Sequence, residues 1–86
     1  MQGLVKAGWS AMDTGDTQKA QGYFDKALQK SPGNAWALYG RGYATEQMGD
    51  RVSARVDYCQ AMARTSEVEL KRELEGAMRR LGGSCQ

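Results

Sequence analysis

Histidine is absent from this sequence of 86 residues, and cysteine is scarce. Histidine is the commonest general base and metal ligand in proteins, and Cys59 and Cys85 have no partners at the spacing of zinc ligands. One cysteine lies in a helical pattern and the other in a glycine-rich tail, which is not a disulfide framework. We therefore expect no enzyme activity, no metal and no other cofactor. We also expect two separate thiols in a reducing, cytoplasmic compartment.

Long apolar runs and a charge bias are missing as well. No stretch approaches the roughly 20 apolar residues that cross a bilayer, and the N-terminus lacks the zones of a secretion signal. Lys and Arg number 12 against 10 Asp and Glu, and residues 1–34, 35–68 and 69–86 carry formal charges of +1, 0 and +1. These features predict no membrane insertion and no basic face for nucleic acid.

What the sequence does contain is a period of 34 residues. Sliding it by that length superimposes apolar, small and turn residues in pairs: Leu4 and Leu38, Gly8 and Gly42, Gly15 and Gly49, Asp16 and Asp50, Ala20 and Ala54, Ala27 and Ala61. The aromatic residues coincide too, Trp9 with Tyr43 and Phe24 with Tyr58. A fixed period of this size is typical of stacked repeats.

Each repeat is predicted to hold two helices. Gly15 and Gly49 suit the left-handed position after a helix, and Asp16 and Asp50 suit the N-cap of the next. We expect helices near 2–14, 17–30, 35–48 and 51–64, with a break at 31–34. A fifth helix is predicted near 67–81, because Ser66 and Glu69 form a capping-box pair before an apolar stripe of Leu70, Leu74, Ala77 and Leu81.

These residues resemble a known family. Gly8, Gly15-Asp16, Ala20, Phe24, Ala27 and Pro32 stand at the spacings of the tetratricopeptide repeat (TPR), and the second unit keeps most of them. The resemblance implies an all-α, right-handed α-solenoid of two helix-turn-helix repeats plus one solvating helix. The units would be repeat 1 at 1–34, repeat 2 at 35–66, a capping helix at 67–82 and a tail at 83–86, within one structural domain.

Three departures from the family pattern affect the second unit and its end. Where Pro32 ends the first unit, the second has Ser66. Arg72 and Glu75 fall where a third unit would need apolar residues, so no third full repeat is expected. Arg41 and Thr45 fall on the expected core face of the second unit. Either Arg41 lays its stem along the surface or the helix is rotated.

The resemblance also indicates a groove. In TPR arrays the first helices of successive units line a concave surface, and at 100° per residue this face presents aromatic side chains here. The candidate partner-binding residues are Val5, Trp9, Met12, Trp36, Tyr39, Tyr43 and Gln47. The alternative is that these rings belong to a thin core.

The function implied by the resemblance is a scaffold or adaptor that binds another protein or a peptide segment of it. Some family members clamp an acidic C-terminal tail with basic and amide side chains, but Val5, Trp9, Tyr39 and Gly40 stand at those positions. We therefore expect an apolar or amphipathic segment, bound with weak charge steering. The alternatives are a structural end-piece or self-association module of a longer repeat protein, and a regulatory domain of a multidomain enzyme.

Overall fold

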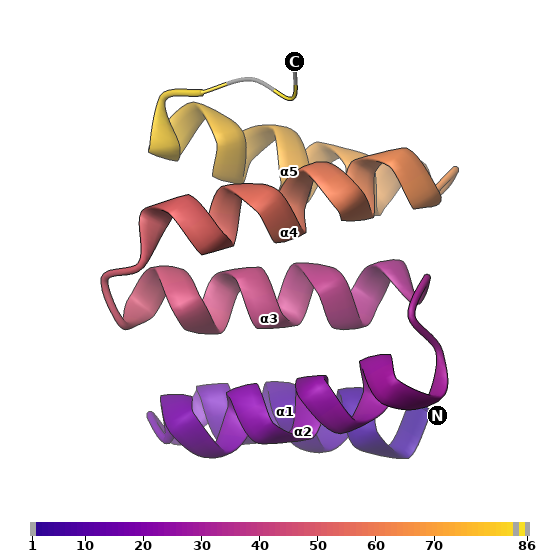
Figure 1. The fold of residues 1–86 in the computed structure, drawn as a ribbon, viewed down its shortest axis with the longest axis vertical. Coiled ribbons are helices and arrows are strands. Elements are labelled where there is room, and N and C mark those ends of the chain that lie inside the picture. The colour runs from indigo at the N-terminus through magenta and orange to yellow at the C-terminus, as the bar shows by residue number, and fades with distance from the viewer. Residues whose placement is uncertain (1, 84, 86) are drawn as a thin grey trace.

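A computed structural model of the protein describes residues 2–83 and residue 85, and this part of the chain forms helices and no strands. The helices are α1 (Gln2–Asp13), α2 (Thr17–Lys30), α3 (Ala35–Gln47), α4 (Arg51–Arg64) and α5 (Val68–Leu81). The predicted bounds agree to within one residue at every helix end. The stack runs from the α1–α2 hairpin at one end to α5 at the other (Figure 1). The predicted all-α helical-repeat solenoid is confirmed.

The helix ends are set by the residues that the period indicated. Gly15 and Gly49 have φ angles of 83° and 92°, a left-handed conformation that glycine adopts without steric cost. The carboxylates of Asp16 and Asp50 each accept a hydrogen bond from the backbone amide three residues on, at 3.2 and 3.1 Å. Both predicted N-caps are therefore confirmed.

The predicted capping box at the start of α5 is wrong. The N-cap of α5 is Glu67, and its side chain makes no capping hydrogen bond. Because the helix begins at Val68, Ser66 lies one position too early to act as N-cap. The Glu67 carboxylate instead reaches across to Trp36.

Small residues set the spacing between the helices around a few large side chains. Phe24 and Tyr58 are fully buried, and the alanines expected at the close contacts have no exposed surface: Ala20, Ala27, Ala54 and Ala61. A Cβ added at Gly8 would lie 2.6 Å from Cε1 of Phe24, closer than carbon atoms pack. Glycine is therefore required where α1 crosses Phe24.

Arg41 binds two carboxylates, and α3 is not rotated. Its guanidinium donates two hydrogen bonds of 3.0 Å to Asp57 of α4 and one of 3.2 Å to Asp25 of α2. Leu38 stays buried, as does Thr45, so α3 keeps the orientation that the period predicts. Of the two alternatives, the structure supports an arginine whose stem lies along the surface rather than a rotated helix. Its partners, Asp25 and Asp57, were not predicted from the sequence.

Cys59 of α4 and Cys85 of the tail are joined in a disulfide, with their Cα atoms 5.3 Å apart. The expectation of two separate thiols is wrong. Helix α5 packs on α4. Gly82, at φ 72°, ends α5 in a left-handed turn, and the disulfide holds Cys85 against α4. Free thiols were the reason to expect a reducing compartment, and the disulfide removes that reason.

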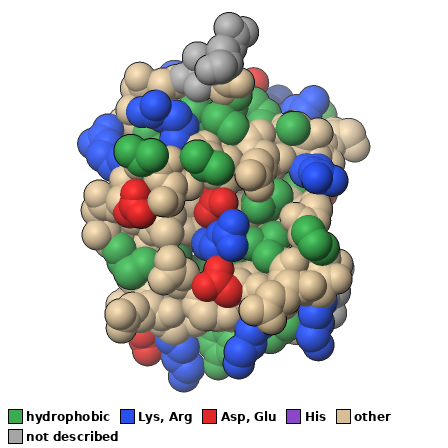
Figure 2. All heavy atoms as spheres, viewed as in Figure 1, with side chains coloured by type: hydrophobic (Ala, Val, Ile, Leu, Met, Phe, Trp, Pro, Cys, Tyr) green, Lys and Arg blue, Asp and Glu red, His purple; other side chains and the backbone are tan. Residues whose placement is uncertain are grey.

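The surface carries no large area of one charge on the face drawn in Figure 2, where basic, acidic and apolar side chains are interspersed. Among the residues described, no helix is both long enough and apolar enough to cross a membrane.

Candidate peptide-binding groove

The first helix of each repeat and the closing helix together border a groove of about 630 Å³. Helices α1 and α3 contribute apolar and aromatic side chains, and α5 contributes charged ones. The lining residues are Val5, Trp9, Trp36, Tyr39, Glu69, Arg72 and Glu73. The volume lies within the range of small-molecule sites in proteins, so only a few side chains of a larger partner would enter it.

The aromatic side of the groove is a continuous set of rings. The Trp9 ring lies 5.3 Å from Tyr39 and 5.8 Å from Tyr43, and Trp36 lies 6.2 Å from Tyr39, measured between ring centroids. These separations are within the range in which aromatic rings attract one another. The rings reinforce each other's positions, so this side of the groove is preformed.

The same rings also touch the core. Trp9 meets the buried ring of Phe24 edge-on at 5.4 Å, and Tyr39 lies 5.9 Å from the buried ring of Tyr58. Trp9, Trp36 and Tyr39 are half-buried. The sequence left open whether these rings line a groove or belong to the core. The structure shows both, because one edge of each ring packs inward and the rest of the ring lines the groove.

Close approach of the backbone explains how α1 and α3 bring their rings together. Gly8 of α1 and Gly40 of α3 both lie directly against the Phe24 ring, where neither leaves room for a Cβ. Gly40 is buried, so its expected place in the groove is wrong. Its role is to let α3 approach Phe24 closely, which places Tyr39 beside Trp9.

Three of the predicted site residues do not line this groove. Tyr43 stacks on Trp9 and has the Arg80 guanidinium 5.9 Å from its ring centroid. Met12 packs with the smaller core cluster around Phe24, and Gln47 is exposed at the last position of α3. Tyr43 extends the ring set away from the groove, toward the C-terminal end of α3.

Two carboxylates of the α5 end of the structure accept hydrogen bonds from the aromatic side. Trp36 Nε1 donates to Glu67 at 2.8 Å, and the Tyr39 hydroxyl donates to Glu73 at 3.1 Å. Burial, together with the negative charge of Glu73, raises the pKa of Tyr39 to about 12. The phenol therefore stays protonated at neutral pH and holds Glu73 at the groove.

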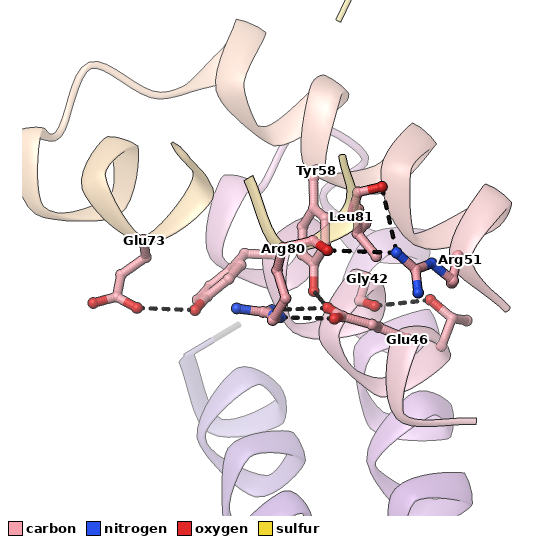
Figure 3. Close-up of polar contacts among 9 residues, drawn as sticks. Gly42, Glu46, Arg51, Tyr58, Glu73, Arg80 and Leu81 are labelled. Carbon is pink, nitrogen blue, oxygen red and sulfur yellow. Dashed lines mark hydrogen bonds and ion pairs between the residues drawn. The ribbon is translucent and has the colours of Figure 1, made fainter. Parts of the chain in front are cut away.

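A second polar network closes the other end of α3 (Figure 3). Glu46 accepts hydrogen bonds from the Tyr58 hydroxyl at 2.7 Å and from two nitrogens of Arg80 at 2.7 and 2.8 Å. The hydrogen bond from Arg80 lowers the pKa of Glu46. Because both Glu46 oxygens already accept bonds from the chain itself, this carboxylate ties α3, α4 and α5 together.

The sequence analysis missed the α5 side of the groove because it identified only the apolar stripe of this helix. The signal was nevertheless present in the period: Glu73 stands 34 residues after Tyr39, which itself stands 34 residues after Val5. Helix α5 thus takes the place of a third first helix, although its sequence is too polar to continue the repeat. Extending the period by one step would have indicated the position of Glu73 on α5, although not its hydrogen bond with Tyr39.

The described residues hold no group of three or more histidine, cysteine, aspartate or glutamate side chains arranged to bind a metal ion. They surround the groove with apolar, aromatic and charged side chains. This arrangement is suited to holding a segment of another molecule.

Comparison with known proteins addresses the family directly. A family model described as tetratricopeptide repeat matches residues 11–56, which is more than half of the chain. No curated protein and no solved structure matches this chain. The match spans residues 11–34 of the first repeat and residues 35–56 of the next, including both Gly-Asp turns. The chain therefore belongs to the tetratricopeptide repeat family.

Proposed function

We propose that this protein is an adaptor module that holds a peptide segment of another protein in the groove between α1, α3 and α5. Tetratricopeptide repeats generally mediate protein–protein interactions and are generally non-catalytic. The observation that carries the proposal is the half-buried ring set of Trp9, Trp36 and Tyr39 along one side of a preformed groove. Rigid aromatic side chains at the edge of a pocket are typical anchors of protein interfaces.

Preorganisation favours this function over a purely structural one. Trp36 and Tyr39 are each held by an aromatic neighbour and by a hydrogen bond to a carboxylate. A partner that buries against them therefore does not have to immobilise the rings itself, which lowers the entropic cost of binding. The acidic groups beside the rings do not suit nucleic acid, whose phosphates bind lysine and arginine.

The test compares the peptide affinity of Trp36→Ala with that of a control variant, Tyr23→Ala. Tyr23 is a half-buried aromatic residue of α2 that lies outside the groove. Peptides selected from a displayed random library on the wild-type chain would be titrated against each variant by fluorescence anisotropy. Trp36→Ala should weaken binding about 30-fold, as expected for loss of an interface anchor. Tyr23→Ala should leave affinity within about twofold.

Stability and oligomeric state, measured on the same samples, separate the alternatives. If Trp36→Ala lowers unfolding free energy by more than about 3 kcal/mol, the ring is part of the core and the proposal fails. If the wild-type chain is a dimer in sedimentation and Trp36→Ala makes it a monomer, the groove is a self-association surface instead. A monomer whose selected peptides lose affinity only when a groove ring is removed supports the adaptor function.

A further inference from the structure

The α5 side of the groove carries carboxylates that have no basic partner. Glu67, Glu69 and Glu73 lie on or beside this wall, against a single guanidinium, that of Arg72. Within the described part of the chain, no lysine or arginine nitrogen comes within 4.0 Å of any of the three. The wall therefore has a formal charge of −2 that the protein does not compensate by direct pairing.

Glu67, Glu69 and Glu73 are exposed, whereas three less exposed carboxylates between the helices are all paired. Asp25 and Asp57 share Arg41, and Glu46 is paired with Arg80. Each of these arginines comes from a helix other than that of its carboxylate partner, so pairing between helices is available to this fold. Among the residues that the structure describes, other exposed carboxylates also lack an ion pair, including Asp13, Asp50 and Glu75. The unpaired charges of the α5 wall differ from these because they lie beside the aromatic side of the groove.

The hydrogen bonds already made at the wall determine what a ligand must bring. Trp36 Nε1 and the Tyr39 hydroxyl are used as donors to Glu67 and Glu73. A carboxylate offers about four lone-pair sites, so both still have acceptor capacity after one bond. Apart from Arg72, the wall presents acceptors, and a ligand that complements it must supply donors and positive charge.

We infer, as a refinement that rests on the proposed peptide-binding function, that the groove selects a segment in which a lysine or arginine stands next to an apolar side chain. The apolar side chain packs on Val5 and the Trp36 ring, and the cation lies between the α5 carboxylates and the face of an aromatic ring. Cations are attracted to such faces by the ring quadrupole, and the carboxylates add a charge-assisted hydrogen bond. This reverses the charge preference of family members that clamp acidic tails, and it replaces the weak charge steering expected from the sequence.

Lys6 marks the limit of the acidic region. It borders a neighbouring hollow with Val5, Asn34 and Trp36, and no described residue of α5 lines this hollow. A cation is therefore favoured toward α5 and disfavoured toward the hollow. The bound segment should place its basic residue on the α5 side.

The experiment uses three synthetic peptides that share the same apolar residues, which include leucine but no tryptophan. The peptides differ at one position only, which is lysine, glutamine or glutamate. Binding to the intact chain is followed by tryptophan fluorescence at low and at high salt. The lysine peptide should bind about tenfold more tightly than the glutamine peptide at low salt, from one exposed ion pair and one cation–π contact combined. The glutamate peptide should bind most weakly, and high salt should narrow the differences.

Protein variants assign the preference to the wall. Glu69→Gln with Glu73→Gln removes two charges but keeps an acceptor for the Tyr39 hydroxyl, and it should reduce the lysine preference to within about twofold. Glu75→Gln is the matched control, because Glu75 is exposed on α5 but lies outside the groove. It should leave the preference intact.

The outcomes distinguish this inference from the function on which it rests. Equal affinity for the lysine and glutamine peptides, with binding still lost in Trp36→Ala, overturns the charge preference and leaves the adaptor function standing. A lysine preference that survives the double replacement places the selective charge elsewhere and also overturns it. Failure of all three peptides and of library-selected peptides to bind overturns both.

Discussion

Replacing Arg41 by methionine should lower the free energy of unfolding by about 3 kcal/mol. Methionine has a similar reach and keeps the apolar contacts of the arginine stem, but it removes the guanidinium that bonds Asp57 twice at 3.0 Å. The Asp57 side chain is only 7% exposed, so its carboxylate would be left with little water and no donor. Breaking a buried ion pair in this way typically costs about 3–5 kcal/mol.

The lower end of that range applies because the Arg41 side chain is itself 32% exposed. Water that enters where the guanidinium was can solvate part of the Asp57 charge. The second carboxylate of the group, that of Asp25, is 48% exposed and accepts only one bond, of 3.2 Å. Asp25→Asn should therefore cost less than about 1 kcal/mol, as exposed pairs do.

Urea unfolding followed by far-UV circular dichroism would measure these differences, with thermal melting as a second reading. A loss of about 3 kcal/mol corresponds to a fall in Tm of more than about 10 °C for a domain of this length. A double-mutant cycle with Arg41→Met and Asp57→Leu isolates the pair, and the double variant should recover most of the loss because no buried charge remains. An Arg41→Met loss below about 1 kcal/mol, or an Asp25→Asn loss as large as that of Arg41→Met, would refute a penalty for leaving Asp57 buried and unpaired.

Three further predictions concern close packing, the disulfide and acid stability. Gly8→Ala should destabilise the fold by about 1–3 kcal/mol, because the added methyl group overlaps with Phe24. Gly22→Ala, at an open helical position, should instead raise stability by up to about 1 kcal/mol. If the melting temperatures of both variants shift in the same direction, the packing explanation is contradicted. Cys59→Ser, or reduction of the disulfide, opens a loop with a sequence separation of 26. On the chain-entropy model this should lower the free energy of unfolding by about 3.5 kcal/mol. If reductant leaves the unfolding midpoint unchanged, the bond is absent in solution. The pKa of Glu46 is lowered in the folded state by its arginine partner, so the stability from this contact is present above the unfolded pKa and is lost as pH falls through the folded pKa. Between about pH 5 and pH 3 the wild type should therefore lose more stability than Glu46→Gln, and parallel pH profiles would count against the contact.

Local signals in the sequence determined where the helices begin and end. The Gly-Asp turns act within a few residues of themselves, through a left-handed glycine and a side-chain cap, so they predict helix bounds without knowledge of the fold. The capping box at Ser66 failed because its pattern is also compatible with a start one residue later. The N-cap of α5, Glu67, makes no side-chain capping bond, so no local capping signal marks where this helix begins.

The repeat period likewise determined the architecture and the aromatic side of the groove. Residues that recur every 34 positions take equivalent places in successive units, so Val5 and Tyr39, or Trp9 and Tyr43, could be assigned to one face from the sequence alone. What they touch on their inner edges could not be assigned, because that depends on how closely the helices approach. Gly40 shows this, since its role follows from the position of Phe24 on another helix.

Only the tertiary structure decided which distant charges and thiols meet. The partners of Arg41 lie 16 residues away in both directions, Glu73 reaches Tyr39 across 34 residues, and Cys59 bonds Cys85 across 26. Each pairing depends on the angle and distance between stacked helices, to which many small contacts contribute and which no short motif encodes. The sequence by itself thus determined a two-repeat helical stack with an aromatic face, and the packing of α5 against that stack decided the acidic wall of the groove.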